Sequence, residues 1–140
     1  MDKKIVNFIQ KHHILSCSFF SETSIHSASC FYLFLENPAR FIVASSKDTL
    51  HVKLALANPM VSGTIHLETK TIGKIQGIQY RGRWERANSD EKKAYLKNYP
   101  YAIALNPKLW CIEIEYIKFT DNTLGFGKKL EYKKALHVEL

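Results

Sequence analysis

Residues 41–59 read FIVASSKDTLHVKLALANP, and this stretch organises the rest of the chain. It opens with an apolar, β-branched run, breaks into a turn rich in hydroxyl groups, and resumes with apolar residues at positions 50, 54 and 57. That spacing is typical of one face of a helix. The sequence therefore predicts a strand, a turn and a helix, and the helix ends at Asn58 because Pro59 lacks an N–H donor.

The turn of this unit is a candidate phosphate site. The first turn of a helix has unpaired N–H groups and the positive end of the backbone dipole, which together favour an anion. Ser45, Ser46 and Thr49 add hydroxyl groups there, and Lys47 adds a cation. A simpler interpretation stays open, in which Ser46 or Asp48 only caps the helix.

The residues before this unit predict a helix and a β-hairpin. Between Lys3 and His12, apolar residues recur on one helical face. Residues 13–20 and 25–34 alternate between two faces, and the turn residues between them make the two runs a hairpin. The small residues Ser27, Ala28 and Ser29 leave room beside the sheet, either for a flat group or for a second closely packed sheet.

The residues after the unit predict further antiparallel strands. We expect strands over 60–66, over an alternating run from Ile72 to Trp84, over 109–120 and over 130–132, with a helix from Asn88 to Lys97. The 109–120 strand is expected to place Trp110, Ile112, Ile114 and Tyr116 on one face. Strands without a βαβ rhythm indicate a mostly β, α+β fold, a small antiparallel barrel with a few short helices.

Composition limits the class of protein. A chain of 140 residues with 46% hydrophobic content predicts one domain over residues 1–140. Most of the net charge of +7 lies in the second half, which favours anionic partners. Cys17, Cys30 and Cys111 lie in apolar runs without CxxC spacing, so we expect buried free thiols in a cytoplasmic protein. The apolar patch after Lys4 is interrupted too soon for a signal peptide or a membrane span.

The usual signatures of a self-sufficient enzyme are missing from the sequence. It contains no HExxH, GxSxG or P-loop pattern, and its six histidines show no metal-ligand spacing, so we expect no metal site. Any redox reaction would need a cofactor. A basic binding module is the alternative, but Arg81 and Arg83 fall on the opposite strand face from Tyr80 and Trp84, which makes a nucleic-acid partner unlikely.

Three runs carry a resemblance to a known family: Phe31–Phe34 (FYLF), Gly77–Gly82 (GIQYRG) and Ile117–Lys129 (IKFTDNTLGFGKK). The chain resembles the pyridoxamine 5'-phosphate oxidase-like, FMN-binding split β-barrels, most closely the bacterial YhbP-like family. The resemblance implies a homodimer that holds FMN between its subunits, and an FMN-binding protein or flavin-dependent oxidoreductase acting on a small molecule. Trp110 and Ile112 are expected to lie uncovered in one subunit and to be buried by the second. Related barrels handle haem, for which His13 or His26 is a candidate axial ligand.

The same resemblance implies roles for individual residues. The phosphate side of FMN corresponds to Ser45, Ser46, Lys47, Thr49 and His51, the ring side to Ser27, Ala28 and Ser29, and the partner subunit's contribution to Gln76, Gln79 and Trp110. This chain has Leu50 where such barrels usually have arginine. Without that guanidinium a charged contact is lost, so FMN is expected to bind weakly, to give way to another flavin, or to be absent.

Overall fold

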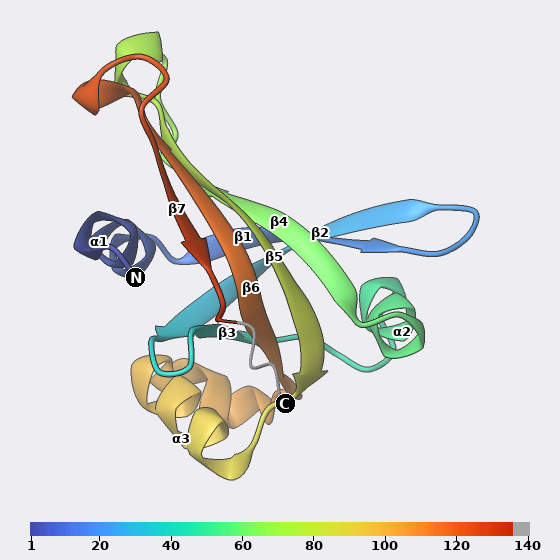
Figure 1. Cartoon of the computed structure of the whole chain (residues 1–140). Helices are drawn as coiled ribbons and strands as arrows, with labels where there is room; N and C mark the ends of the chain where they lie inside the picture. Colours follow the sequence, from blue (N-terminus) through green and yellow to red (C-terminus); the bar gives the residue numbers. More distant parts are fainter. Residues whose placement is uncertain (136–140) are drawn as a thin grey trace, which may run out of the picture.

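The computed structural model describes residues 1–135, so the last five residues of the expected 1–140 domain lie outside it. Figure 1 shows strands wrapped around a common core, with short helices at the ends. The helices and strands are, in chain order, α1 Lys3–Lys11, β1 Ile14–Phe20, β2 Ile25–Leu35, β3 Arg40–Ala44, α2 Leu50–Ala57, β4 Met60–His66, η1 Ile72–Lys74, β5 Gln76–Arg86, α3 Ser89–Asn98, η2 Pro100–Leu105, β6 Leu109–Asp121, η3 Asn122–Leu124 and β7 Lys129–Lys133.

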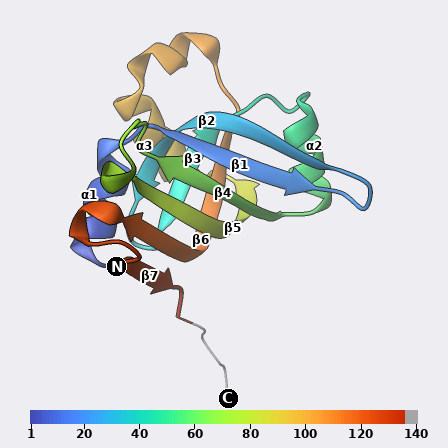
Figure 2. The same cartoon turned by 90° about the horizontal axis from the view of Figure 1, so that it is seen from above.

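The strands form a closed antiparallel barrel. Their order in the sheet is β3-β2-β1-β4-β5-β6-β7, and β3 also pairs with β6, which closes six strands into a ring. β7 stays outside the ring and, among residues 1–135, pairs with β6 alone (Figure 2). This architecture confirms the predicted small split β-barrel with a few short helices.

Period-two alternation decides which side chains fill the barrel. In β1, Leu15, Cys17 and Phe19 are buried, whereas Ser16 and Ser18 point outward. β2 pairs antiparallel with β1 over the whole of that strand, which confirms the predicted hairpin. All three cysteines are buried free thiols, as predicted.

A β-bulge changes the expected faces of β6. The register with β5 shifts between Arg81 and Gly82, so that Glu115 is an extra residue on β6. After it the alternation is reversed: Ile117 is buried and Tyr116 lies opposite the outward-facing Arg81. The prediction that Tyr116 shares a face with Trp110 was therefore wrong.

The start of β5 also differs from the sequence prediction. Ile72 begins a short 3-10 helix and is exposed, and the strand starts only at Gln76. The N–H groups of Lys74 and Ile75 donate to Thr71 and Ile72, respectively, and this tight turn prevents pairing with β4.

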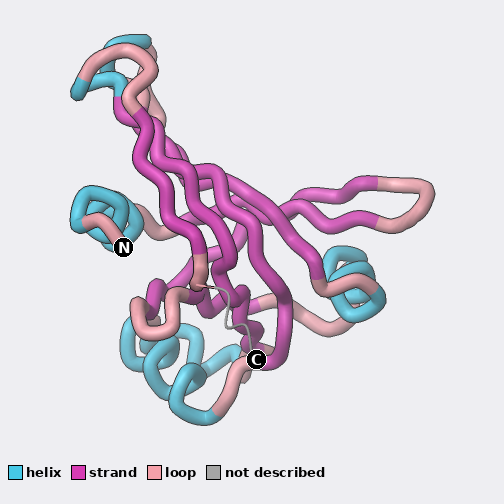
Figure 3. Tube along the Cα trace, in the orientation of Figure 1, coloured by secondary structure: helices cyan, strands magenta, loops and turns pink. Residues whose placement is uncertain are grey.

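α1 packs against the interior core of the barrel, whereas α3 packs on the outer face of β3 and β6 (Figure 3). α1 buries Ile5, Phe8 and Ile9, and the ring of Phe8 lies 5.2 Å from that of Phe119 on β6. α3 begins with a capping box between Asn88 and Glu91, at the predicted start of this helix. Glu91 also accepts a 2.6 Å hydrogen bond from Nε of Arg40, which ties α3 to β3.

α2 buries a different face from the one expected. Val52 and Ala55 face the core, whereas Leu50 and Ala57 are exposed. The helix is short and largely apolar, so residue spacing alone does not define a unique buried face. Its N-cap is Thr49, whose hydroxyl accepts from the N–H of Val52, so neither Ser46 nor Asp48 caps it.

Candidate functional site

The candidate phosphate turn, residues 45–51, is held by residues at the start of β6. The N–H of Ser45 donates to the carbonyl of Lys108 at 3.1 Å. The indole Nε1 of Trp110 donates to the carbonyl of Ser45 at 2.8 Å. Because both bonds engage backbone atoms, the Ser45 hydroxyl stays available for other partners.

Three polar side chains converge at this turn. Nε2 of His51 lies 2.9 Å from the Ser45 hydroxyl oxygen and 3.4 Å from that of Thr49. The ring of His51 stacks on that of His26, with centroids 6.5 Å apart. Partial burial, and then the nearby His26, lower the pKa of His51, so its imidazole is neutral near pH 7.

Two backbone donors at the start of α2 are free. Thr49 satisfies the N–H of Val52, but the N–H groups of Leu50 and His51 have no backbone acceptor among residues 1–135. Free donors at a helix N-terminus, next to three hydroxyl groups, form an arrangement that accepts an anion.

The surroundings of the turn are positively charged. The like charges of Arg86 and Lys47, and less strongly Lys92, lower the pKa of Lys108. These cations come from the end of β5, the turn, α3 and the segment before β6, and only Lys47 was identified from sequence. Strand register could have located Arg86 and Lys108, because β5 and β6 both have an end beside Ser45. Asp48 is the one acidic residue in the turn, and it is exposed.

The expected ring-side residues divide between two faces of β2. Ala28 shares a face with His26 and Cys30, and the sulfur of Cys30 lies 3.7 Å from the Ser45 hydroxyl. Ser27 and Ser29 point to the outer face, where Ser27 hydrogen bonds to Ser18 at 2.8 Å. Only Ala28 of the three is thus oriented toward the side of β2 that meets the turn.

Trp110 does not lie on the surface as expected. Trp110 and Ile112 are both 0% exposed within a single chain, and the Trp110 indole stacks on that of Trp84, with centroids 5.6 Å apart. The barrel itself covers these residues because β6 turns them toward the core. The argument that a second subunit must cover them was wrong. Trp110 instead stabilises the turn through its hydrogen bond to the carbonyl of Ser45.

Gln76 and Gln79 are far from the turn within one chain. They lie near the start of β5, whereas Arg86 at its other end is close to Lys108. Gln76 and Arg86 are ten positions apart, which corresponds to about 33 Å of extended strand. The structure therefore brings together Ala28, Ser45, Thr49 and His51, but not the two glutamines.

Residues 1–135 contain no group of three or more His, Cys, Asp or Glu side chains arranged to hold a metal ion. In the same range no helix is long and apolar enough to cross a membrane. His13 directly precedes β1, and His26 lies on β2 opposite Phe19 near the other end of β1, so these candidate haem ligands cannot act on one group together.

Solved structures with the same fold include three barrels of low sequence identity. One is a heme binding protein from Mycobacterium smegmatis (TM-score 0.74, 12% identity, 90% of this chain and 55% of that one). Another is a FAD-binding protein from Mesorhizobium loti (TM-score 0.67, 12% identity, covering 82% of this chain and 88% of that one). The third is a putative pyridoxamine 5'-phosphate oxidase from Listeria innocua (TM-score 0.67, 14% identity, covering 84% of this chain and 95% of that one). The chain thus has the split β-barrel fold of pyridoxamine 5'-phosphate oxidase-like proteins.

Close relatives define the family within that class. A UPF0306 protein of Campylobacter jejuni is 36% identical over 135 residues, covering 96% of this chain and 99% of its own. A UPF0306 protein of Yersinia pestis is 37% identical over 139 residues, covering 96% and 95%. The chain belongs to the UPF0306 family. No family model matches it, and the narrower YhbP-like assignment stays a prediction.

Proposed function

We propose that this protein binds FMN, with the flavin phosphate at residues 45–51, and acts as an FMN-binding protein or a flavin-dependent oxidoreductase. The observation that carries the proposal is the convergence of free N–H groups, the Ser45 hydroxyl and the cations Lys47, Arg86 and Lys108 on one short turn. Flavin and pyridoxamine 5'-phosphate oxidase neighbours of the same fold support the choice of ligand.

The residues of the turn have distinct roles in this proposal. The hydroxyls of Ser45 and Ser46 and the N–H groups of Leu50 and His51 donate to phosphate oxygens, while Lys47 supplies charge. A phosphate dianion beside His51 would favour the protonated imidazole, opposing the burial that now lowers the pKa of this residue. Bound flavin supplies hydride or electron transfer, and the protein orients it and controls its electrostatics.

The ring of the flavin is proposed to follow β2 on the side of Ala28. A small side chain there leaves the ring room near the backbone, between His26 and Cys30. Ser27 and Ser29 reach a ligand only from the outer face of the strand. The substrate would be a small molecule that approaches the exposed part of the ring.

We further propose a homodimer, in which a second copy supplies Gln76 and Gln79. A candidate contact surface is η2, where Tyr101 is 93%, Ile103 61% and Leu105 80% exposed. The exposed ring of Phe31 packs 6.1 Å from that of Tyr99, directly before η2, and extends this apolar surface. Sedimentation at micromolar concentration tests the proposal, and a monomer would exclude a flavin site shared between subunits.

The decisive experiment compares FMN with riboflavin, which lacks the phosphate. Titration into wild type should show tighter binding of FMN. Ser46→Ala and Lys47→Ala should each weaken FMN about ten- to a hundredfold, the effect of one lost charged hydrogen bond, and leave riboflavin unchanged. Lys53→Ala is the matched control, because Lys53 is exposed on α2 beyond the turn.

Equal binding of both flavins by wild type, or unchanged FMN binding by both folded turn variants, would refute the site.

The absorbance of the purified protein separates the cofactors, since flavin gives a yellow protein and haem a Soret band. Haem is the alternative because one neighbour with this fold is a heme binding protein.

A further inference from the structure

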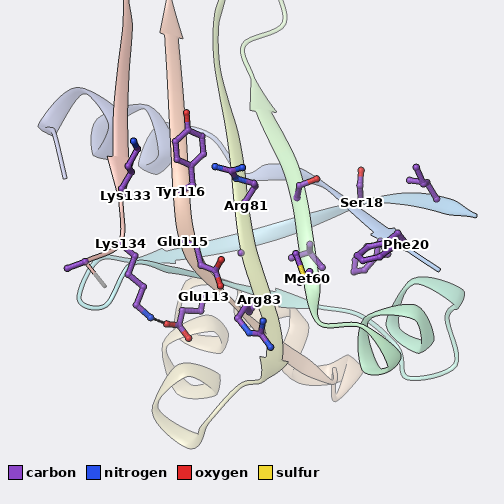
Figure 4. A pocket seen from close by; sticks show the side chains of 16 residues that line it. Ser18, Phe20, Met60, Arg81, Arg83, Glu113, Glu115, Tyr116, Lys133 and Lys134 are labelled. Atoms are coloured by element: carbon purple, nitrogen blue, oxygen red, sulfur yellow. Dashed lines mark ion pairs between the residues drawn. The ribbon is translucent and has the colours of Figure 1, made fainter. Parts of the chain in front are cut away.

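A large cavity lies on the outer face of the barrel, away from the phosphate turn. Its volume is about 1140 Å³, and it spans the outer faces of β1, β4, β5 and β6 up to the end of β7 (Figure 4). None of the residues assigned to flavin lines it. Its size exceeds that of most drug-sized ligand pockets, so a small organic molecule fits inside.

One end of the cavity is apolar. Phe20 pairs with Ile25 across the β1–β2 hairpin, and Met60 on β4 lies beside Phe20, because Ser18 pairs with Ser62 two residues away on each strand. Ile25 is 80%, Phe20 39% and Met60 57% exposed. Three large apolar side chains that remain in water on one face of a sheet indicate a surface that binds apolar groups.

The adjacent part of the cavity is cationic. Met60 pairs directly with Arg83, and Ser62 with Arg81, so two guanidinium groups follow the apolar end on the next strand. Arg81 is oriented by Tyr116, whose ring centroid lies 4.3 Å from its Cζ. Arg83 pairs with Glu113 in register, but the carboxylate of Glu113 forms its ion pair with Lys134. Neither arginine has an ion-pair partner within the described residues.

The charges around the cavity limit the ligand to a low negative charge. Four cations line it, Arg81, Arg83, Lys133 and Lys134, against two carboxylates, those of Glu113 and Glu115. The excess of two positive charges attracts one anionic group, and the two carboxylates disfavour a polyanion.

The geometry points to a site for an amphipathic organic anion. The apolar body of the ligand contacts Ile25, Phe20 and Met60, and its single carboxylate or sulfonate lies between Arg81 and Arg83. Apolar side chains beside a pair of guanidinium groups provide both contacts on one continuous surface (Figure 4). This site is independent of the proposed flavin site.

The test uses two fluorescent dyes, 8-anilino-1-naphthalenesulfonate and its uncharged analogue N-phenyl-1-naphthylamine, without flavin. Arg81→Gln and Arg83→Gln should each weaken the sulfonate about tenfold or more and leave the neutral dye unchanged. Met60→Gln should weaken both dyes. Lys118→Gln is the matched control, because Lys118 also lies on the outer face of β6, opposite Gln79, but does not line the cavity.

Decanoate should displace the sulfonate dye, whereas inorganic phosphate and FMN should not. Failure of FMN to bind leaves this result unchanged, so the two proposals are tested separately. The cavity proposal is overturned if Lys118→Gln weakens the sulfonate as much as the arginine variants do, or if those variants affect both dyes equally. It is also overturned if wild type binds neither dye because a second copy covers this face, which sedimentation would reveal.

Discussion

Gly63 on β4 lies where the barrel has no room for a side chain, and its replacement tests the packing directly. A Cβ at this position would lie 1.8 Å from the carbonyl oxygen of Ser16 and 2.5 Å from the hydroxyl of Tyr80. These two groups form a 2.7 Å hydrogen bond across β4, and Tyr80 is 1% exposed. Gly63→Ala must therefore displace a strand, break this bond, or do both.

The expected cost of Gly63→Ala follows from these two effects. Forcing a methyl group into a packed core costs about 1–3 kcal/mol, and a buried polar group left without its partner costs about 1–3 kcal/mol more. The free energy of unfolding should fall by about 2–6 kcal/mol, which corresponds to a decrease in Tm of roughly 6–18 °C for a chain of this size.

Chemical denaturation of wild type and variant measures this change. Gly73→Ala is the control, because a Cβ at Gly73 meets no atom within 4 Å and the free energy should change by less than about 0.5 kcal/mol. Tyr80→Phe separates the two effects, since it removes the hydroxyl without adding volume and should cost about 1 kcal/mol. A loss below about 0.5 kcal/mol in Gly63→Ala would refute the close approach of β1, β4 and Tyr80.

Three further predictions concern the turn and the core. Leu50→Arg should strengthen FMN binding about ten- to a hundredfold by adding a guanidinium at the start of α2, whereas Leu56→Arg, equally exposed on that helix, should have no effect in the same titration. Burial and His26 lower the pKa of His51 in the folded chain, so the unfolded chain takes up a proton more readily. The free energy of unfolding should thus fall as the pH drops below about 6.5, and His51→Gln should flatten this decline in pH-dependent denaturation, with an unchanged slope contradicting the argument. Burial raises the pKa of Cys17 to about 12, so a disulfide reagent should leave this thiol unmodified until the protein is unfolded; rapid labelling of native Cys17 would contradict its burial.

The barrel was predictable where alternation was strict. Residues 13–20 and 25–34 alternate regularly on either side of a turn, so the hairpin of β1 and β2 follows from the sequence alone. The prediction failed at Tyr116, because a bulge on β6 depends on pairing with Gly82 of another strand. It failed for α2 because that helix is apolar on several sides, and its contacts with β1, β2 and β5 select the buried face.

The candidate site was predictable in its turn but not in its surroundings. The hydroxyl groups and the lysine before a predicted helix indicated a candidate phosphate site at Ser45–His51. The cations Arg86 and Lys108 are distant in sequence and join the turn only through strand pairing. Trp110 was misassigned because an aromatic residue on an alternating strand looks the same in sequence whether it faces the core or a partner, and here it faces the core.

The closure of the barrel by β3 and β6 has a consequence for synthesis on the ribosome. Ala44 pairs with Leu109 and Arg40 with Glu113, partners that are 65 and 73 positions apart in the chain. At a synthesis rate of about 5–20 residues per second, β3 waits roughly 3–15 s for the strand that covers it. During that interval Phe41, Ile42 and Val43, which are fully buried in the finished barrel, can pair with β2 but lack β6, their second partner strand. This segment is where a nascent chain of the family would most need protection by a chaperone.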